Sequence, residues 1–503
     1  MVNEKKAGVI LGFASMVLFS VVSIIYTPVQ LRMLGQSEYG IIGLSNSVTG
    51  YLSLLTFGLS ASFIRNNARY REKGDKIGEH RLNGMYFAVY CVIAVFILIC
   101  GAVLVFNVDS MFGKELTAAE LFKTKVIMAL TVVSMAINLP FHVYNINIVA
   151  YERFIFSRMV IIINTLLLPL ITVPLLFLGI RSVGVVIVSL SITMFNLIIN
   201  IIYARKKVGV KICFDKIDSS IIKGIFAFSS VIFLNSVIDQ VNWNFDKFLL
   251  GMFKGAAPVA VYALGAQFNS YYLNVAMAVT SVFVPQINWL VAKDYHNTDL
   301  PVIFNRVGRI QFVLLFFIFL GFVIFGKPFI IMWVGKDYVD AYYIGLILLG
   351  AITVPLIQGI GLEIQRAKNK HRFCAVVLFF MAIVNILISI PLCRQYGGIG
   401  AALGTGFALL AGNGLIVNIY YHKRLELDVL GFWKGILKFL PALFLPILLG
   451  IMIYMFIDLG SIPWFVLSAL IYAIVYAASM WRLGLNEYEK KLVKTVLNKI
   501  LGR

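Results

Sequence analysis

The residues best placed to do chemistry are polar and ionisable side chains that interrupt long apolar stretches. In the stretch 222–246, Asp239, Asn242 and Asp246 stand at i, i+3 and i+7, which places them on one face of a helix. An ionisable group within a membrane costs about 2.5–3.5 kcal/mol unless it faces water or a partner. We therefore expect this stripe to line a cavity, where either carboxylate would bind a proton or a sodium ion. The alternative is a stripe that only packs against another polar helix.

Four basic residues stand where apolar stretches end, and each is a candidate for holding an anionic group. Arg32 ends the first stretch as Lys247 ends the seventh, and Arg65 and Arg69 follow the second. We expect these four residues to bind a phosphate group. The alternatives are side chains that reach the membrane interface and the ordinary excess of base on cytoplasmic loops.

Uncharged polar residues are spread widely over the apolar stretches. His142 stands between Asn138 and Asn145 in the fourth stretch, either as a hydrogen-bonded packing residue or as a proton relay, and we include it among the candidate lumen residues. Other stretches contribute further amides: Asn164, Asn196, Asn235, Asn269, Asn274, Gln286, Asn288, Gln358, Asn385 and Asn413. A wide, uncharged, hydrogen-bonding lumen fits sugar hydroxyls better than a small bare ion.

Motifs of catalysis and of metal or cofactor binding are mostly absent. The sequence contains no HExxH, GxSxG or Cys/His metal spacing, and none of its five cysteines stands in a CxxC. Gly321–Lys327 imitates a phosphate loop but is followed by Pro328, where that motif needs Ser or Thr. We therefore expect no metal, no cofactor and no enzymatic activity.

Composition identifies the elements that must position these residues. Of 503 residues, 60% are apolar and 13% are charged, and the mean hydropathy is +0.92. A soluble protein is about 25% charged, so the chain is predicted to be an integral membrane protein. The formal net charge is +20, but no basic domain is present, so we expect no nucleic-acid partner.

Fourteen apolar stretches of about 20 residues or more predict fourteen transmembrane helices. With the N-terminus inside, 33 of the 43 Lys and Arg residues fall on cytoplasmic segments. Both termini are therefore expected in the cytoplasm. From Leu485 the sequence predicts an amphipathic basic helix on the inner membrane surface, as a simple anchor or as a docking site for a partner.

Two similar halves follow one another along the chain. Asn200, at the end of the sixth stretch, matches Asn418 at the end of the twelfth, 218 positions later, and Tyr39 matches Tyr262 at nearly the same separation. Because six helices cross the membrane an even number of times, the two copies must be parallel. The prediction is an all-α membrane protein with two parallel six-helix repeats, forming two lobes, and two C-terminal helices. The expected parts are a first lobe at 1–221, a second lobe at 222–435, two further helices at 436–481 and a cytoplasmic tail at 482–503.

Specific segments resemble a known family. The run Arg32-Met-Leu-Gly-Gln-Ser-Glu-Tyr-Gly40, followed by Tyr51, Phe57-Gly-Leu59 and Arg65, is similar to the start of bacterial polysaccharide flippases of the O-antigen type. The run Asp246-Lys-Phe-Leu-Leu-Gly251, followed by Val261-Tyr262, resembles the start of their second half. These flippases belong to the multidrug/oligosaccharidyl-lipid/polysaccharide exporter superfamily.

The resemblance implies movement of an undecaprenyl-pyrophosphate-linked oligosaccharide from the inner to the outer leaflet of the bacterial cytoplasmic membrane by alternating access. Membrane lipid, a coupling proton or sodium ion and a polysaccharide polymerase are the other partners considered. One alternative is a cation-coupled multidrug exporter on the same scaffold, using Asp239 or Asp246. Another is a membrane enzyme, such as a polysaccharide polymerase, although the outside loop 107–125 offers few catalytic residues.

Overall fold

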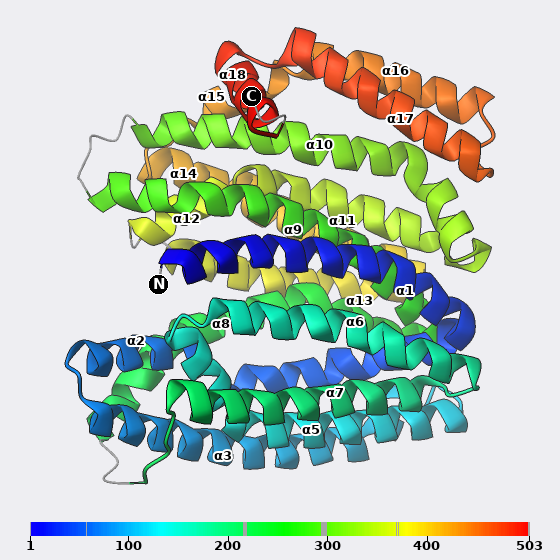
Figure 1. Cartoon of the computed structure of the whole chain (residues 1–503). Helices are drawn as coiled ribbons and strands as arrows, with labels where there is room; N and C mark the ends of the chain where they lie inside the picture. Colours follow the sequence, from blue (N-terminus) through cyan, green and yellow to red (C-terminus); the bar gives the residue numbers. More distant parts are fainter. Residues whose placement is uncertain are drawn as a thin grey trace. The chain divides into compact units, whose positions relative to one another are not determined.

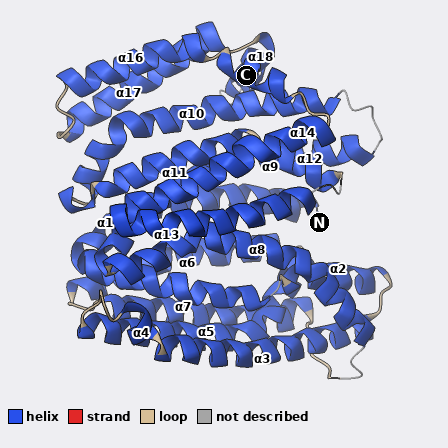
Figure 2. Ribbon diagram, turned by 180° about the vertical axis from the view of Figure 1, so that it is seen from behind, coloured by secondary structure: helices blue, strands red, loops and turns tan. Residues whose placement is uncertain are grey.

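The computed structural model describes residues 2–56, 58–214, 219–292, 299–368, 370 and 372–500. Within these residues every regular element is helical (Figures 1 and 2). A helix satisfies its own backbone hydrogen bonds, which is what a chain in a bilayer requires. The predicted all-α class is therefore confirmed.

The helices form two compact units. The first unit runs to Ala263 and includes Cys393–Gly398, and the second holds Leu264–Leu392 and the chain from Ile399 onward. The predicted lobe boundary at residue 221 follows the repeat, whereas packing joins the next helix, α8, to the first unit.

The elements of the first half are α1 (Val2–Gly50), η1 (Tyr51–Thr56), α2 (Leu59–Glu72), α3 (Lys76–Phe106), α4 (Val108–Phe112), α5 (Ala118–Ala150), α6 (Phe154–Phe177), α7 (Ser182–Tyr203), η2 (Ala204–Val208) and α8 (Ser219–Lys254). Those that follow are α9 (Ala256–Ala292), α10 (Asp299–Trp333), η3 (Lys336–Tyr338), α11 (Asp340–Ile357), α12 (Gly359–Ala367), α13 (Arg372–Leu409), η4 (Leu410–Ile416), α14 (Val417–Arg424), α15 (Val429–Leu437), α16 (Leu440–Phe456), α17 (Ile462–Ser479), η5 (Met480–Gly484) and α18 (Glu487–Ile500).

Ten helical segments in the described part of the chain are long and apolar enough to cross a membrane, and the bent pair α15 and α16 would make eleven. Two of the ten contain a sharp break, at Gly35 within α1 and at Gly397 within α13. Each glycine lies between stretches that the sequence assigns to separate crossings. The chain is thus a multi-pass membrane protein, and the count of fourteen crossings stays a prediction.

Four glycines that join helices mark the internal repeat. Gly35 and Gly255, 220 positions apart, have φ angles of 77° and 82°, and Gly179 and Gly397, 218 positions apart, have φ angles of 84° and 59°. Side chains disfavour this left-handed region, so glycine is the residue that permits such turns. The turns recur at the separation found for the matched Asn and Tyr residues, which supports the repeat.

Residues of the opening motif hold the first unit together. The Glu38 carboxylate is buried and accepts hydrogen bonds from Lys123 Nζ and from the backbone N–H and hydroxyl of Ser182. A Cβ atom on Gly40 would overlap the carbonyl oxygen of Ala256, so glycine lets the two backbones approach. This part of the motif therefore connects α1 to α5, α7 and α9.

In the second unit, Arg309 on α10 joins three C-terminal segments. Its Nε lies 2.6 Å from Glu489 Oε1, and its Nη2 lies 3.1 Å from Glu489 Oε2. Nη1 donates to Gly435 O at 2.6 Å and Nη2 to Gly484 O at 3.1 Å. The two charged side chains are only 13% and 4% exposed. Arg309 therefore connects α15, η5 and α18 to α10.

The predicted C-terminal tail contains helix α18, and residues 501–503 lie outside the described part. Asn486 caps this helix, because Asn486 Oδ1 accepts from the Glu489 N–H and Glu489 Oε2 accepts from the Asn486 N–H, both at 2.9 Å. The start of α18 is thus attached to the protein through Glu489. Its location on a membrane surface stays a prediction.

Candidate functional site

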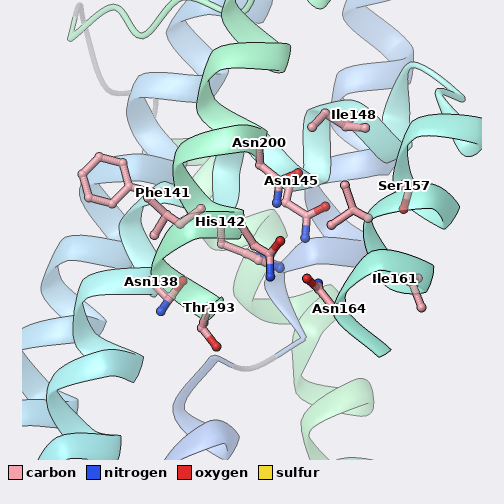
Figure 3. A pocket seen from close by; sticks show the side chains of 13 residues that line it. Asn138, Phe141, His142, Asn145, Ile148, Ser157, Ile161, Asn164, Thr193 and Asn200 are labelled. Atoms are coloured by element: carbon pink, nitrogen blue, oxygen red, sulfur yellow. The ribbon is translucent and has the colours of Figure 1, made fainter. Parts of the chain in front are cut away.

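Three helices of the first unit surround a pocket of about 380 Å³ whose lining is rich in asparagine. Figure 3 shows side chains of His142, Asn145 and Asn164 directed toward one another in this pocket. The lining residues are Asn138, Phe141, His142, Asn145 and Ile148 from α5, Ser157, Val160, Ile161 and Asn164 from α6, and Thr193, Asn196, Leu197 and Asn200 from α7.

Helical spacing explains why these residues share the pocket. On α5, Asn138, His142 and Asn145 stand at i, i+4 and i+7, and on α7, Asn196 and Asn200 stand at i and i+4. Residues at these spacings lie on one face of a helix. Each helix therefore presents a single polar stripe to the pocket, while its exposed face carries large apolar side chains.

Most of the pocket amides have hydrogen-bonding capacity to spare. Asn138 Nδ2 donates to Ser134 O at 2.9 Å within its own helix. Among the described residues, the side chains of Asn145, Asn196 and Asn200 make no hydrogen bond, and Asn164 Oδ1 is buried without a partner. Buried polar groups are normally paired, so these amides are available to a bound molecule or to water.

The predicted lumen residue His142 does line this pocket. Its ring meets the edge of Tyr90, with the ring centroids 6.2 Å apart and the planes at 81°. Asn147, on the same helix, is instead a packing residue. Its Nδ2 donates to Asn83 Oδ1 at 2.9 Å and to Val143 O at 2.8 Å.

The four basic residues predicted to bind phosphate do not form one cluster. Arg65 and Arg69 are exposed on α2, whereas Arg32 is exposed just before the break at Gly35. Arg32 and Arg65 are 33 positions apart in the sequence, with the break at Gly35 and the segment η1 between them. Lys247 is half-buried, eight residues before the turn at Gly255. The structure thus divides the set into residues near the two interhelical turns and the Arg65–Arg69 pair on α2.

The predicted acidic stripe lies on α8, away from the asparagine pocket. Asp246 is fully buried, and the Tyr262 hydroxyl donates a hydrogen bond to its Oδ2. Asn242 is half-buried and Asp239 is exposed. None of the three lines the pocket. Within the described residues, no three His, Cys, Asp or Glu side chains gather where a metal ion would bind.

The corresponding positions of the second half are filled differently. At the repeat separation of 217–221 positions, each pocket asparagine has an amide counterpart in the second half. The pairs are Asn138 with Gln358, Asn145 with Gln365, Asn164 with Asn385, Asn196 with Asn413 and Asn200 with Asn418. Four of these five are buried, and Asn413 is half-buried.

Several of the second-half amides are bonded within the protein. Gln358 Nε2 donates to Asn418 Oδ1 at 2.8 Å, and Trp433 Nε1 donates to the same atom at 3.3 Å. Asn385 Nδ2 donates to Thr405 Oγ1 at 3.1 Å. Three of the five second-half amides are thus bonded within the protein, whereas the Gln365 side chain is buried without a hydrogen-bond partner among the described residues.

A π-helical segment explains one irregularity in this correspondence. Asn196 and Asn200 are four residues apart, whereas Asn413 and Asn418 are five apart. The π-helix η4 covers residues 410–416, and a π-turn accommodates one extra residue. Asn418 Nδ2 accordingly donates to Asn413 O, five residues back, at 3.1 Å.

The pocket is suited to binding rather than to covalent chemistry. An asparagine amide offers two donors and one carbonyl acceptor, so several together match a molecule with many hydroxyl or amide groups. Sequence reasoning found these asparagines individually and predicted a sugar-compatible lumen. It did not identify which of them face one pocket, because that depends on how three helices pack.

Comparisons with known proteins place the chain in a family. The model of one protein family, described as "Polysaccharide biosynthesis protein", matches residues 6–290. The "Uncharacterized membrane protein EpsK" of Bacillus subtilis is 20% identical over 494 residues, which is 95% of each chain. The "Probable low-salt glycan biosynthesis flippase Agl15" of Haloferax volcanii is 22% identical over 177 residues, 34% of this chain and 37% of that protein.

Solved structures share the fold. A structure of "Lipid II flippase MurJ, inward closed conformation" covers 99% of both chains with a TM-score of 0.72 and 15% identity. An inward-facing multidrug resistance MATE family transporter of the MOP superfamily covers 83% of this chain and 96% of its own, with a TM-score of 0.65 and 14% identity. At these identities the likeness concerns the fold.

Proposed function

The chain belongs to the polysaccharide biosynthesis protein family, and we propose that it is a flippase that moves a lipid-linked oligosaccharide from the inner to the outer leaflet by alternating access. The lipid carrier would be undecaprenyl pyrophosphate, and the product would supply a cell-surface polysaccharide such as an O-antigen. The protein would lie in the bacterial cytoplasmic membrane with both termini in the cytoplasm. A polysaccharide polymerase would use the delivered oligosaccharide.

The observation that carries this proposal is the asparagine pocket. Its unbonded amides offer donors and acceptors without a charge among the lining residues except through His142. Sugar hydroxyls both donate and accept, so they can pair with both kinds of amide atom. The half-buried lining is accessible in a way that the buried amides of the second half are not.

Basic residues near this pocket are placed to attract the pyrophosphate. Arg71 Nη1 donates to Ala150 O at 2.5 Å, which brings the ends of α2 and α5 together. On α2, Arg69 stands two residues and Arg65 six residues before Arg71, and Asn145 stands five residues before Ala150 on α5. We propose that this pair receives the pyrophosphate from the cytoplasmic leaflet, whereas Arg32 and Lys247 contact it at release.

The buried carboxylate on α8 is the proposed coupling site. Asp246 lies out of contact with bulk solvent beside the Tyr262 hydroxyl, where gain of a proton or a sodium ion would change the charge of a desolvated group. Asp239, two helical turns earlier, is exposed and would lie on the route of the ion. Binding of the ion would reset the cycle after the oligosaccharide leaves.

The same carboxylate favours a second candidate, a cation-coupled multidrug exporter. A hydrophobic cation bound in the asparagine pocket would lack a carboxylate partner, because no Asp or Glu lines that pocket. The flippase is therefore the first proposal. Replacing Asp239 and Asp246 together by Asn would abolish drug export under the second candidate.

A strain without this gene, but with its glycosyltransferases intact, tests the function. We expect lipid-linked oligosaccharide to accumulate facing the cytoplasm and surface polymer to be lost, and expression of the wild-type chain to reverse both. The Asn145→Ala/Asn200→Ala double variant should fail to restore polymer, whereas Asn107→Ala, an exposed residue outside the pocket, should restore it. Normal polymer with new drug sensitivity would instead favour the exporter. Single units at the surface without long polymer would indicate a polymerase.

A further inference from the structure

We propose that the asparagine pocket selects an uncharged sugar, with an acetamido sugar fitting best, and rejects a sugar that carries a carboxylate. This inference rests on the proposed flippase function and specifies which class of sugar unit the pocket accepts. Three features of the pocket support it: its lack of charge, the polarity of its unpaired atoms and its apolar walls.

Apart from the His142 ring, the lining provides no side chain that could carry a positive charge to an acidic sugar. None of the thirteen lining residues is Lys, Arg, Asp or Glu. Moving a carboxylate from water into a site without a positive partner is strongly unfavourable. A hydroxyl or acetamido group carries no such cost once its hydrogen bonds are made. The absence of Lys and Arg from the lining therefore favours the uncharged class of sugar.

Arg205, in η2 directly after α7, is a basic side chain close to the pocket helices and is already engaged. Arg205 Nε and Nη2 lie 3.2 Å and 2.9 Å from the hydroxyl of Tyr144, which is buried between α5 and the end of α7. The guanidinium also lies 5.5 Å from the centre of the Tyr144 ring. Tyr144 does not line the pocket, so these contacts direct Arg205 to a neighbouring residue rather than to the bound sugar.

One buried atom of the pocket, Asn164 Oδ1, requires a ligand that donates a hydrogen bond. Asn164 Oδ1 is buried and has no partner, and an amide oxygen only accepts. The side chains of Asn145 and Asn200 each add a further carbonyl oxygen with no bond among the described residues. A carboxylate at neutral pH has no hydrogen to donate, whereas hydroxyl and acetamido groups do. A carboxylate beside Asn164 Oδ1 would leave that oxygen unpaired, whereas the amides of Asn145 and Asn200 can pair with a donor or with an acceptor.

The remaining walls suit the less polar parts of a sugar. Between the amides the pocket is lined by apolar side chains, which are Phe141, Ile148, Val160, Ile161 and Leu197. These side chains can contact the C–H face of a ring and the methyl of an acetamido group, whose N–H and C=O can pair with asparagine amides. The volume of about 380 Å³ lies within the range of about 300–1,000 Å³ typical of small-molecule pockets.

The test uses the full-length protein in proteoliposomes with two fluorescent undecaprenyl-pyrophosphate oligosaccharides. The two compounds are identical except that one sugar is N-acetylglucosamine in the first and glucuronic acid in the second. Outer-leaflet exposure is followed by a membrane-impermeant glycosidase or by periodate. We expect the wild-type protein to flip the neutral compound at least tenfold faster than the acidic one.

Charge variants of one pocket residue assign the selectivity to the pocket. Asn200→Lys should reduce the preference for the neutral compound by at least fivefold, because it supplies the missing cation. Asn200→Asp, which is nearly isosteric, should lower the flipping rate of the acidic compound further. This variant tests the selectivity if the Lys variant does not fold. Asn107→Lys, with the same charge change outside the pocket, should leave the preference unchanged.

The outcomes separate the two levels of the proposal. Equal flipping of both compounds, or a preference that neither Asn200 variant alters, overturns the selectivity while leaving the flippase function intact. A preference for the acidic compound also overturns it. If neither compound is flipped by a protein that elutes as a folded species, the proposed function itself fails.

Discussion

Breaking the Arg309–Glu489 pair should destabilise the second unit, and the loss of stability should depend on which of the two residues is replaced. In the variant Arg309→Met, the Glu489 carboxylate stays buried with the Asn486 N–H as its remaining donor among the described residues. Leaving one partner of a buried ion pair uncompensated costs about 3–5 kcal/mol. In Glu489→Gln, the Gln oxygen can still accept from Arg309, and Gly435 O and Gly484 O still accept from the guanidinium. The cost should then be about 1.5–3 kcal/mol, the worth of a hydrogen bond to a charged group.

These free energies translate into melting temperatures that can be measured. A domain of about 150–250 residues loses about 2–4 °C per kcal/mol, so Arg309→Met should lower the transition of the second unit by about 6–20 °C and Glu489→Gln by about 3–12 °C. The assay is thermal unfolding of purified protein in detergent, with labelling of the buried Cys374 thiol as the readout of unfolding. Arg366→Met, which removes an exposed i,i+3 pair with Glu363, is the matched control and should shift the transition by less than about 2 °C.

The double variant Arg309→Met/Glu489→Leu decides whether the charge argument is correct. It removes the stranded carboxylate together with its partner, and apolar replacement of a buried pair is often nearly neutral. We expect it to melt higher than Arg309→Met alone. If its melting temperature falls by the sum of the two single shifts, or if Arg309→Met behaves like the surface control, the reasoning from burial and charge is refuted.

Three further predictions follow from contacts in the two units. Asn200→Ala should abolish most transport but change the free energy of unfolding by less than about 0.5 kcal/mol, because the amide has no bonded partner to lose. Asn385→Ala should instead lower the free energy of unfolding by about 1–3 kcal/mol, because it breaks buried hydrogen bonds. Thermal unfolding and oligosaccharide flipping are measured on both variants, and the reverse order would contradict the prediction. Asp246→Asn should keep the fold, because the amide oxygen still accepts a hydrogen bond from the Tyr262 hydroxyl. The variant should remove any dependence of flipping on a proton or sodium gradient. A gradient dependence equal to that of the wild type would exclude this carboxylate as the coupling site. Gly40→Ala should lower the melting temperature and the yield of folded protein, because its Cβ meets a backbone oxygen that cannot turn away. Gly12→Ala, on the same helix with its nearest new contact at an ordinary 3.5 Å, is the control, and equal yields of the two variants would be the contrary result.

Much of the fold could be predicted from the sequence because membrane helices depend on local properties. Length, hydropathy and the spacing of Lys and Arg specify where helices begin and end, and the repeat follows from residues such as Asn200 and Asn418 at one separation. The packing of α8 with the first unit could not be predicted in this way. It depends on close approaches of glycines, such as Gly251 against the Leu44 side chain, that only the folded chain brings together.

The candidate site was predicted less completely. The sequence placed His142 among lumen residues, and the structure puts it in the pocket. The sequence also grouped Arg32 with Arg65, and this grouping stays a prediction. The ion pair between Arg309 and Glu489 was missed, because its partners are 180 positions apart and nothing local marks a Glu in a basic tail as buried. Charge patterns report local surroundings, whereas long-range pairing depends on tertiary contacts.

The contrast between the asparagine pocket and its bonded counterpart has a consequence for how this transporter can evolve. After a duplication, two copies of one helical unit begin with the same duties. Here the first copy keeps its amides available, whereas the second uses Gln358, Asn385 and Asn418 to hold its own helices together. Substitutions at pocket positions such as Asn145 can therefore adapt the protein to a new cargo with little effect on folding, while the second copy remains under selection as a scaffold. One half can change its specificity because the other half does not.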